Sequence, residues 1–485
     1  MDAIDVRVVD QSRVVGDVDA YPRHGPMANG RKQAARANGQ GATPRYRAIS
    51  ERRLDRIPQL AGRPADEQFA MRVVSQVLPF RTNDYVIDLI DWSQVPDDPI
   101  YQMTFPQRGM LDPKDFDRIA DLLKRGATRD EIEPVVESIR AGLNPHPAGQ
   151  RELNIPSDAE AGMLEGIQHK YRETVLFFPS RAQTCHAYCT FCFRWAQFVG
   201  KDMKIYAKQM TGLHRHLATH PEVTDLLITG GDPMVMKAPV LSRYIRPILE
   251  SPDMSHVRNI RIGTKSLTFW PHRFVTDPDA DELLRLLEQV VESGRHVAVM
   301  AHFNHWRELS TEVVQTAIRR LRDTGVVIRA QAPLLRHIND DPAVWARMWE
   351  DEVRLGIVPY YMFVERDTGA KRYFEVPLAR AQRIYADAVR GVSGLARTVR
   401  GPSMSAAPGK VEVVGVQHVQ GEAVFVLRFL QGRNPDWVGV PFFAAFDPEA
   451  TWLDQLKPAF GEQRFFFENE FESMRERTFE AAVGP

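Results

Sequence analysis

The spacing of apolar residues predicts helices in the first third of the chain. Apolar positions recur every three or four residues in 66–78 and 112–126, acidic residues stand early in both segments, and a glycine ends the second. Such spacing is typical of amphipathic helices. Proline and aspartate gather in 88–100, which indicates a loop between the two helices. We therefore expect a helical N-terminal region over 56–165.

Short apolar runs alternate with helical patterns through the middle of the chain. The runs are 174–178, 225–231, 260–264, 296–303, 326–335 and 358–364. Segments with helical spacing, such as 281–294 and 311–325, separate them. A strand followed by a helix, repeated about six times, predicts parallel strands joined by crossover helices. The expected fold class is α/β, with a partial (β/α)6 barrel over 166–400 whose chemistry lies at the carboxyl ends of the strands.

Both ends of the chain depart from this pattern. Residues 1–55 are rich in Gly, Ala, Arg and Asn and poor in large apolar side chains, which predicts a mobile, solvated arm. Near the other end, 410–430 alternates like strands and 440–468 is rich in aromatic residues. We expect a strand-containing C-terminal appendage over 401–485 that closes over the barrel or forms a subunit contact. A homo-oligomer is therefore possible.

Composition narrows the choice of partners and compartment. The chain has 62 basic and 63 acidic residues, a balance that argues against nucleic acid or an anionic membrane as the main partner. It contains no run of about 20 apolar residues that could span a membrane. The first residues lack the basic-then-apolar order of a signal peptide. We expect a cytoplasmic protein, in which thiolates stay reduced.

All three cysteines, Cys185, Cys189 and Cys192, fall within eight positions. An odd number of closely spaced cysteines does not suit disulfides. A tetrahedral zinc site would need a fourth ligand, for which His186 is the nearest candidate but has poor reach beside Cys185. An iron-sulfur cluster usually takes four cysteines, so three would leave one iron of a [4Fe-4S] cube open to a ligand. A chance group of free thiols is the remaining interpretation.

The Cys-x3-Cys-x2-Cys spacing, with the aromatic Phe191 before the third cysteine, resembles the radical S-adenosylmethionine (radical SAM) superfamily. From about residue 80 to about 430 the chain resembles its lysine 2,3-aminomutase branch. The similar segments are 84–100, 169–177, 185–194, 226–233, 260–266, 301–310, 330–340 and 407–416. The resemblance implies a [4Fe-4S] cluster, S-adenosylmethionine, pyridoxal phosphate and an electron donor such as flavodoxin or ferredoxin. It also implies an isomerase that moves an amino group of a small amino acid from C2 to C3.

The resemblance implies roles for particular residues. Lys410 matches the lysine that carries pyridoxal phosphate, with Lys170 and Arg261 as candidates for the phosphate group, and Arg194 matches the arginine that binds the substrate α-carboxylate. The residues expected to line the S-adenosylmethionine site are Phe191, Gly230, Gly231, Asp232, His302, Asn304 and Gln331. Each also has an ordinary interpretation: an exposed loop lysine, a strand-ending turn, a surface ion pair or a buried polar group.

Two departures from the lysine enzyme bear on the substrate. Where that enzyme uses two aspartates to bind the distal ammonium, this chain has Arg366 and, as the best match, Arg400. Cations at these positions would repel lysine and attract a distal carboxylate. We therefore predict an acidic substrate, glutamate before aspartate. Alternatively, Arg366 pairs with Glu365 or Asp367 on the surface.

Other functions stay open at this point. They are a lysine 2,3-aminomutase, an enzyme that modifies a protein lysine, and a non-catalytic iron-sulfur protein. The same radical chemistry could also deaminate or decarboxylate its substrate. The sequence does not specify the stereochemistry, the pathway or the number of subunits.

Overall fold

The computed structural model describes residues 43–483 except 159–161, 201–202 and 209. Its N-terminal region is helical, as predicted, and contains α2 (Ala65–Val77), α3 (Asp84–Leu89), α4 (Pro99–Thr104), α5 (Pro113–Lys124) and α6 (Arg129–Gly142). Most of the predicted arm, 1–42, lies outside the described residues. Its last part contains β1 (Ala48–Ser50), which pairs antiparallel with β2 (Arg81–Asn83), so the arm ends earlier than expected.

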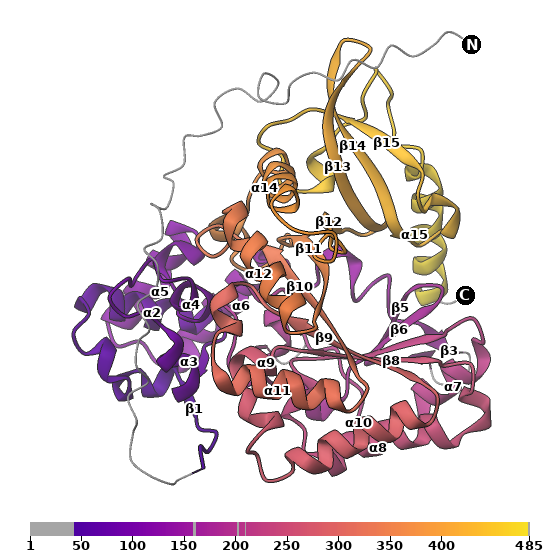
Figure 1. Ribbon diagram of the computed structural model, residues 1–485. Helices are drawn as coiled ribbons and strands as arrows, with labels where there is room; N and C mark the ends of the chain where they lie inside the picture. The colour runs from indigo at the N-terminus through magenta and orange to yellow at the C-terminus, as the bar shows by residue number, and fades with distance from the viewer. Residues whose placement is uncertain (1–42, 159–161, 201–202, 209, 484–485) are drawn as a thin grey trace.

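The centre of the molecule is a run of parallel strands covered by helices (Figure 1). The strands are β6 (Thr174–Phe177), β7 (Asp225–Ile228), β8 (Asn259–Thr264), β9 (His296–His302), β10 (Val327–Leu334), β11 (Val358–Val364) and β12 (Arg400–Ser405). The crossover helices are α7 (Thr211–Thr219), α8 (Ala238–Glu250), α10 (Ala280–Glu292), α11 (Glu312–Asp323), α12 (Pro342–Arg354) and α14 (Leu378–Arg390). This is the predicted α/β partial barrel.

Buried and half-buried side chains alternate along the strands, so one face of the sheet packs in the core and the other faces the barrel interior. On β10 the residues Ile328, Ala330 and Leu334 are buried and belong to the main hydrophobic cluster beneath the helices. Arg329 and Gln331 alternate with them and are only half-buried. Because successive side chains of a strand point to opposite faces, the polar set faces the interior of the barrel. Gln331 lies opposite His302 of β9 in the register.

Antiparallel strands extend the sheet at both edges. At one edge, β5 (Ile167–Tyr171) pairs with β6. At the other, β13 (Gly409–Val419), β14 (Glu422–Gly432) and β15 (Pro441–Ala445) form the long hairpins at the top of Figure 1, followed by α15 (Glu468–Val483). The remaining short strands and α-helices are β3 (Ser157–Asp158), β4 (Gly162–Met163), α9 (Ser266–Phe269) and α13 (Lys371–Phe374), and short 3-10 helices occur in the connections. No helix within the described ranges is long and apolar enough to cross a membrane.

Candidate active site

The N-terminal helical region holds the cysteine loop in place. Backbone hydrogen bonds of 2.9 Å join Tyr188 N to Arg81 O and Thr190 N to Met103 O. The Asn83 amide donates to His186 O at 3.1 Å. Phe191 is buried in the same hydrophobic cluster as the N-terminal helices, with its ring edge-on to Phe374 at 5.9 Å. Phe191 therefore anchors the loop by packing, and its predicted contact with S-adenosylmethionine stays a prediction.

The three thiols form a donor set suited to an iron-sulfur cluster. All are free, and the neighbouring thiols contribute to raising the pKa of Cys185 and of Cys189. Burial is the largest cause, and it raises the pKa of Cys192 to about 11 and those of Cys185 and Cys189 further above the usual range. Buried thiolates need a cation to compensate their charge, and the irons of a [4Fe-4S] cluster supply it. His186 Nδ1 is hydrogen-bonded to Ser266 at 2.9 Å, so this histidine has a structural partner of its own.

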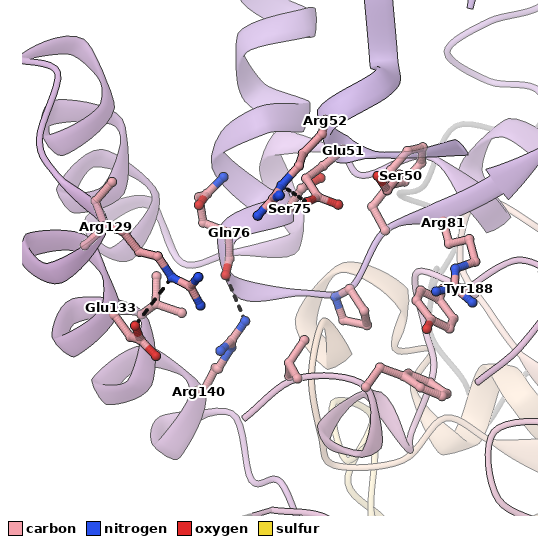
Figure 2. A pocket seen from close by; sticks show the side chains of 16 residues that line it. Ser50, Glu51, Arg52, Ser75, Gln76, Arg81, Arg129, Glu133, Arg140 and Tyr188 are labelled. Carbon is pink, nitrogen blue, oxygen red and sulfur yellow. Dashed lines mark hydrogen bonds and ion pairs between the residues drawn. The ribbon is translucent and has the colours of Figure 1, made fainter. Parts of the chain in front are cut away.

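A cavity of about 580 Å³ lies on the outer side of the cysteine loop (Figure 2). Tyr188, from the loop itself, stacks on Phe198 with ring centres 4.3 Å apart and forms part of its wall. The charged residues of the lining come from the N-terminal region: Arg52, Arg81, Arg129 and Arg140, with Glu51 and Glu133 paired to Arg52 and Arg129 at 3.7 and 3.6 Å. Arg81 also donates to Cys185 O at 3.2 Å. The cavity thus reaches the cysteine loop at Tyr188 and has more arginines than glutamates in its lining.

The Gly-Gly-Asp loop after β7 packs directly against the start of the cysteine loop. A Cβ on Gly231 would lie 2.5 Å from Thr184 O, and Gly230 has φ +149° with its Cβ position 3.0 Å from Ala182 O. Neither position can carry a side chain without moving backbone. The glycines therefore allow the close approach of two protein loops, and their predicted contact with S-adenosylmethionine stays a prediction.

Asp232 is occupied by hydrogen bonds within the protein. Its carboxylate accepts from Thr264 Oγ1 at 2.7 Å and from Ser266 Oγ and the backbone N–H of Met234 and Lys265 at 2.9 Å each. These bonds tie the end of β7 to the end of β8. Asp232 therefore positions these two strand ends, and its predicted contact with S-adenosylmethionine stays a prediction.

The other predicted residues meet at the carboxyl ends of β9 and β10. Gln331 Nε2 and His302 Nε2 are 2.9 Å apart, and burial lowers the pKa of His302 to about 3, so its ring is neutral at pH 7. Asn304 Oδ1 accepts from Lys265 Nζ at 2.9 Å, and its Nδ2 is buried with no partner among the described residues. An unpaired buried amide N–H is costly unless a ligand accepts from it. Asn304 thus fits a S-adenosylmethionine site.

Sequence analysis missed the buried ion pair beneath these residues. Lys265 Nζ lies 2.7 Å from Glu308 Oε1, and both side chains are largely buried. Lys265 also acts electrostatically on Cys189, which places its ammonium near the cysteine loop. Both residues stand in segments that resemble the aminomutase branch, but nothing in their local spacing indicates that they pair.

Lys410 lies inside the barrel, close to several cations. Its Nζ donates to Gln431 Oε1 at 3.0 Å and stands 4.1 Å from the centre of the Tyr361 ring. Burial, with the nearby Arg261, Arg366 and Arg400, lowers the pKa of Lys410 to about 7. A neutral amine is the form that attacks an aldehyde. Lys410 therefore fits the covalent attachment of pyridoxal phosphate.

A group of cations lies beside Lys410. Lys170 Nζ donates to Ala406 O, and burial together with Arg433, Arg366 and Lys410 lowers its pKa well below the usual range. Arg433, which follows β14, was not predicted from the sequence; its Nε donates to Ala407 O at 2.9 Å. A phosphate dianion would compensate this concentration of positive charge.

Arg261 does not join the cations around Lys170. Its Nε binds Asp225 of the neighbouring strand β7 at 2.7 Å. With Arg400 it lines a separate cavity of about 220 Å³ that includes Asn259 and His296, residues at the amino ends of β8 and β9. The bond to Asp225 uses one N–H of the guanidinium, and the charge of Arg261 acts on Lys410, so the predicted phosphate contact stays a prediction.

Arg194 and Arg366 both lie close to one aromatic ring, that of Phe193. The guanidinium carbons lie 5.1 and 4.6 Å, respectively, from the centre of Phe193. Arg194 Nη1 donates to Gly230 O at 3.3 Å, and burial and the charge of Arg366 lower its pKa to about 10. Arg366 Nη1 is buried without a hydrogen-bond partner in the described part of the chain. There, too, no ion pair joins Arg366 to Glu365 or Asp367, so the surface pairing considered from the sequence does not occur.

Arg400 lies at the other end of the strands. It begins β12, where it is exposed, pairs with Tyr361 in the parallel register, and donates to the Tyr361 hydroxyl at 3.3 Å. Arg366 follows the carboxyl end of β11. Because β11 and β12 are parallel, the two arginines are separated along the strands. The structure therefore does not bring Arg400 to the predicted substrate site beside Arg366.

The partial barrel and its three-cysteine loop define a radical SAM enzyme. A putative L-lysine 2,3-aminomutase from Aquifex aeolicus is 30% identical over 393 residues, which cover 81% of this chain and 91% of that protein. The L-lysine 2,3-aminomutase of Bacillus subtilis is 25% identical over 335 residues, 69% of this chain and 60% of that protein. The chain belongs to the lysine 2,3-aminomutase family. It is an isomerase that uses a [4Fe-4S] cluster, S-adenosylmethionine and pyridoxal phosphate.

Two solved structures resemble this chain only distantly. The radical S-adenosylmethionine methyltransferase TsrM from Kitasatospora setae is 13% identical, with a TM-score of 0.29 over 50% of this chain and 48% of that one. Streptococcus suis SuiB bound to the precursor peptide SuiA is 13% identical, with a TM-score of 0.31 over 57% of this chain and 58% of that one. No protein-family model matches the chain.

Proposed function

We propose that this enzyme is a 2,3-aminomutase for an acidic α-amino acid, L-glutamate ahead of L-aspartate. The observation that carries the proposal is the pair of buried guanidiniums of Arg194 and Arg366 beside the Phe193 ring, close enough for the charge of Arg366 to act on Arg194. In this arrangement Arg194 binds the α-carboxylate and Arg366 binds the distal carboxylate. Glutamate is placed first because its longer side chain reaches farther from the α-carboxylate than that of aspartate.

Charge supports an acidic substrate over lysine. Two buried cations repel each other, and an uncompensated buried charge costs several kcal/mol, on the order of 2–5. A dicarboxylate removes this cost, whereas the ammonium of lysine would add a third cation. Burial raises the pKa of both carboxyl groups next to Arg366, those of Glu365 and Asp367, which disfavours their charged forms as compensation for the guanidinium.

The residues of the site divide the remaining tasks. Lys410 attaches pyridoxal phosphate, Lys170 and Arg433 hold its phosphate, and Asn304, His302 and Gln331 face S-adenosylmethionine. When bound, the cluster and S-adenosylmethionine supply the radical that removes a substrate hydrogen, and pyridoxal phosphate holds the migrating nitrogen. The protein binds both ends of the substrate and excludes water from the reacting carbons.

The test is an anaerobic incubation of cluster-loaded protein with both cofactors, dithionite and one amino acid at a time. Glutamate, aspartate, lysine, arginine and alanine are offered separately, and α- and β-amino products are resolved by chromatography. We expect a β-amino product from glutamate. A product from lysine alone would overturn the acidic-substrate proposal while keeping the family. A deaminated or decarboxylated product would overturn amino-group migration.

The cavity beside the cysteine loop supports a docking position for the electron donor. An acidic electron-transfer protein, such as a flavodoxin or ferredoxin, would meet Arg52 and Arg129 on the rim of this cavity. Charge complementarity of this kind mainly raises the rate of association. A donor bound there would contact Tyr188, which belongs to the same loop as the three cysteines.

A further inference from the structure

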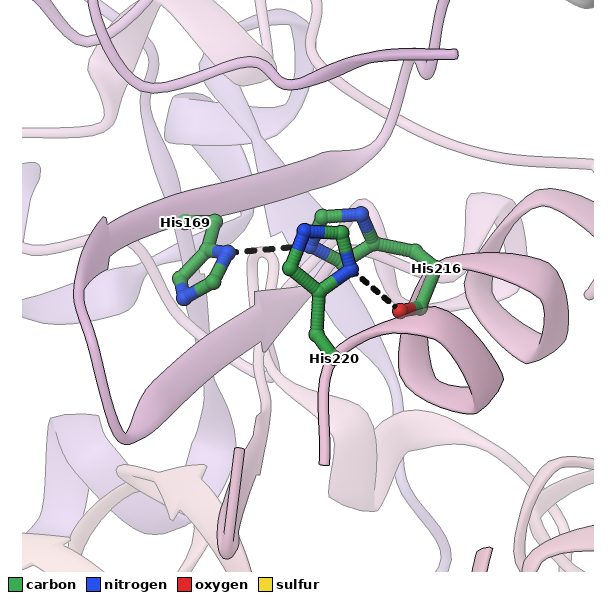
Figure 3. Close-up of side chains that lie close together, drawn as sticks. All are labelled: His169, His216 and His220. Atoms are coloured by element: carbon green, nitrogen blue, oxygen red, sulfur yellow. Dashed lines mark hydrogen bonds between the residues drawn. The ribbon is translucent and has the colours of Figure 1, made fainter. Parts of the chain in front are cut away.

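Three histidines from segments on both sides of the cysteine loop in sequence come together between β5 and α7 (Figure 3). His169 belongs to β5, His216 to the last turn of α7, and His220 caps that helix. One ring nitrogen of each lies within 4.8 Å of the other two. His169 Nδ1 and His216 Nε2 are only 3.0 Å apart.

We propose that His169, His216 and His220 bind one divalent transition-metal ion, zinc in the first place. Zinc–nitrogen bonds are about 2.0–2.1 Å long, so two nitrogens of a tetrahedral site stand roughly 3.3 Å apart. The separation between His169 and His216 is already close to this value. His216 and His220 are four residues apart at the end of one helix, a spacing that places them on the same face.

Hydrogen bonds orient two of the rings for this role. His220 Nδ1 lies 2.7 Å from His216 O, which leaves Nε2 of that ring for the metal. His169 Nε2 lies 3.2 Å from Arg172 O, which leaves Nδ1. Metal-binding histidines usually donate their second N–H to a carbonyl or carboxylate in this way, since the bond determines which nitrogen can coordinate.

The ligand types select the metal class. Three imidazoles without a thiolate suit zinc, cobalt, nickel and copper, and do not suit magnesium or calcium, which prefer oxygen. Water is the simplest fourth ligand. Glu222, which is half-buried and close enough to His169 to act on its charge, is the carboxylate available as an alternative.

Such a metal would connect the edge of the sheet to the helix that covers it. His169 directly precedes Lys170, which lies among the cations around Lys410, and its backbone N–H donates to Asn154 O at 2.7 Å. Arg433, in turn, donates to Leu153 O at 3.1 Å. The ion would therefore hold β5 in position behind the phosphate-binding group without contacting the cofactor. Metal binding at this site does not depend on the identity of the amino acid substrate.

The test uses cluster-loaded protein without an affinity tag, incubated with zinc alone and then gel-filtered. Elemental analysis is expected to find one zinc per chain besides the iron. Zinc absorption spectroscopy is expected to show nitrogen or oxygen neighbours at about 2.0–2.1 Å and no sulfur near 2.3 Å. The sulfur shell distinguishes this site from zinc bound to the cysteine loop.

Two variants complete the experiment. His220→Gln is expected to lose the zinc while keeping its iron and its circular dichroism, which would show that it folds. His214→Gln changes a histidine on the same helix outside the trio and is expected to retain the zinc. Zinc should raise the melting temperature of the wild type and His214→Gln but not that of His220→Gln. Three results would each overturn the proposal. They are a wild-type protein that retains no zinc, sulfur neighbours around the zinc, and full zinc content in folded His220→Gln.

Discussion

The pKa of Lys410 leads to a quantitative prediction about cofactor binding. Burial and nearby arginines lower it from 10.5 to about 7. At pH 8 an amine with pKa 7 is neutral for roughly 0.9 of the time, and one with pKa 10.5 for roughly 0.003, a ratio of about 300. Because the neutral amine is the form that reacts, Lys410 should capture pyridoxal phosphate far faster than an ordinary lysine at this pH.

The assay measures the initial rate of capture between pH 6 and 9.5. Cofactor-free, cluster-loaded protein is mixed with pyridoxal phosphate, trapped with borohydride at intervals, and the modified peptide is quantified by mass spectrometry. Since the pKa of Lys410 is lowered, the neutral fraction rises through pH 7 and levels off above about pH 8. Nα-acetyl-lysine, measured alongside, corrects for ionisation of the cofactor and should continue to gain rate throughout this range.

Variants determine whether the captured site is the predicted one. Lys410→Ala should lose the modified peptide, whereas Lys124→Ala, at an exposed lysine on α5, should behave like the wild type. The reasoning would be refuted by a wild-type rate that rises with pH in parallel with Nα-acetyl-lysine. Equal labelling of folded Lys410→Ala would refute the assignment of the residue itself.

Three further predictions concern the substrate, the cysteine loop and the reductant. Arg366→Met should lower kcat/KM for glutamate by about 30- to 4,000-fold, equivalent to about 2–5 kcal/mol for a buried charge left unpaired. Arg390→Met, at an exposed arginine paired with Asp387, should have no effect, and equal kinetics in both variants would contradict the role of Arg366. Gly231→Ala should lower the iron content after reconstitution because its Cβ meets Thr184 O at 2.5 Å, whereas Gly142→Ala meets nothing within 4 Å and should bind iron normally. Arg52→Glu combined with Arg129→Glu should slow turnover driven by flavodoxin but not by dithionite; equal slowing with both reductants would argue against docking at this cavity.

The sequence by itself determined the local elements and the donor set. The change from helical spacing to alternating strands and helices predicted the partial barrel. A helix or strand that buries one face repeats its apolar residues with a characteristic period, and this period is visible in the sequence. The three cysteines were informative because they lie within eight positions of the chain. Their spacing alone therefore indicates that they can bind one group together. Lys410 was found through its resemblance to the family, and its lowered pKa, caused by burial inside the barrel, became apparent only in the structure.

Tertiary structure alone decided which distant side chains meet. Arg433 joins Lys170 across more than half of the chain, and His169 joins His216 from a different element. It also separated Arg400 from Arg366, because the parallel register of β11 and β12 places them at opposite ends of the strands. A sequence pattern reports the period and polarity of one element at a time. The contacts between elements depend on register and crossover, which no local spacing encodes.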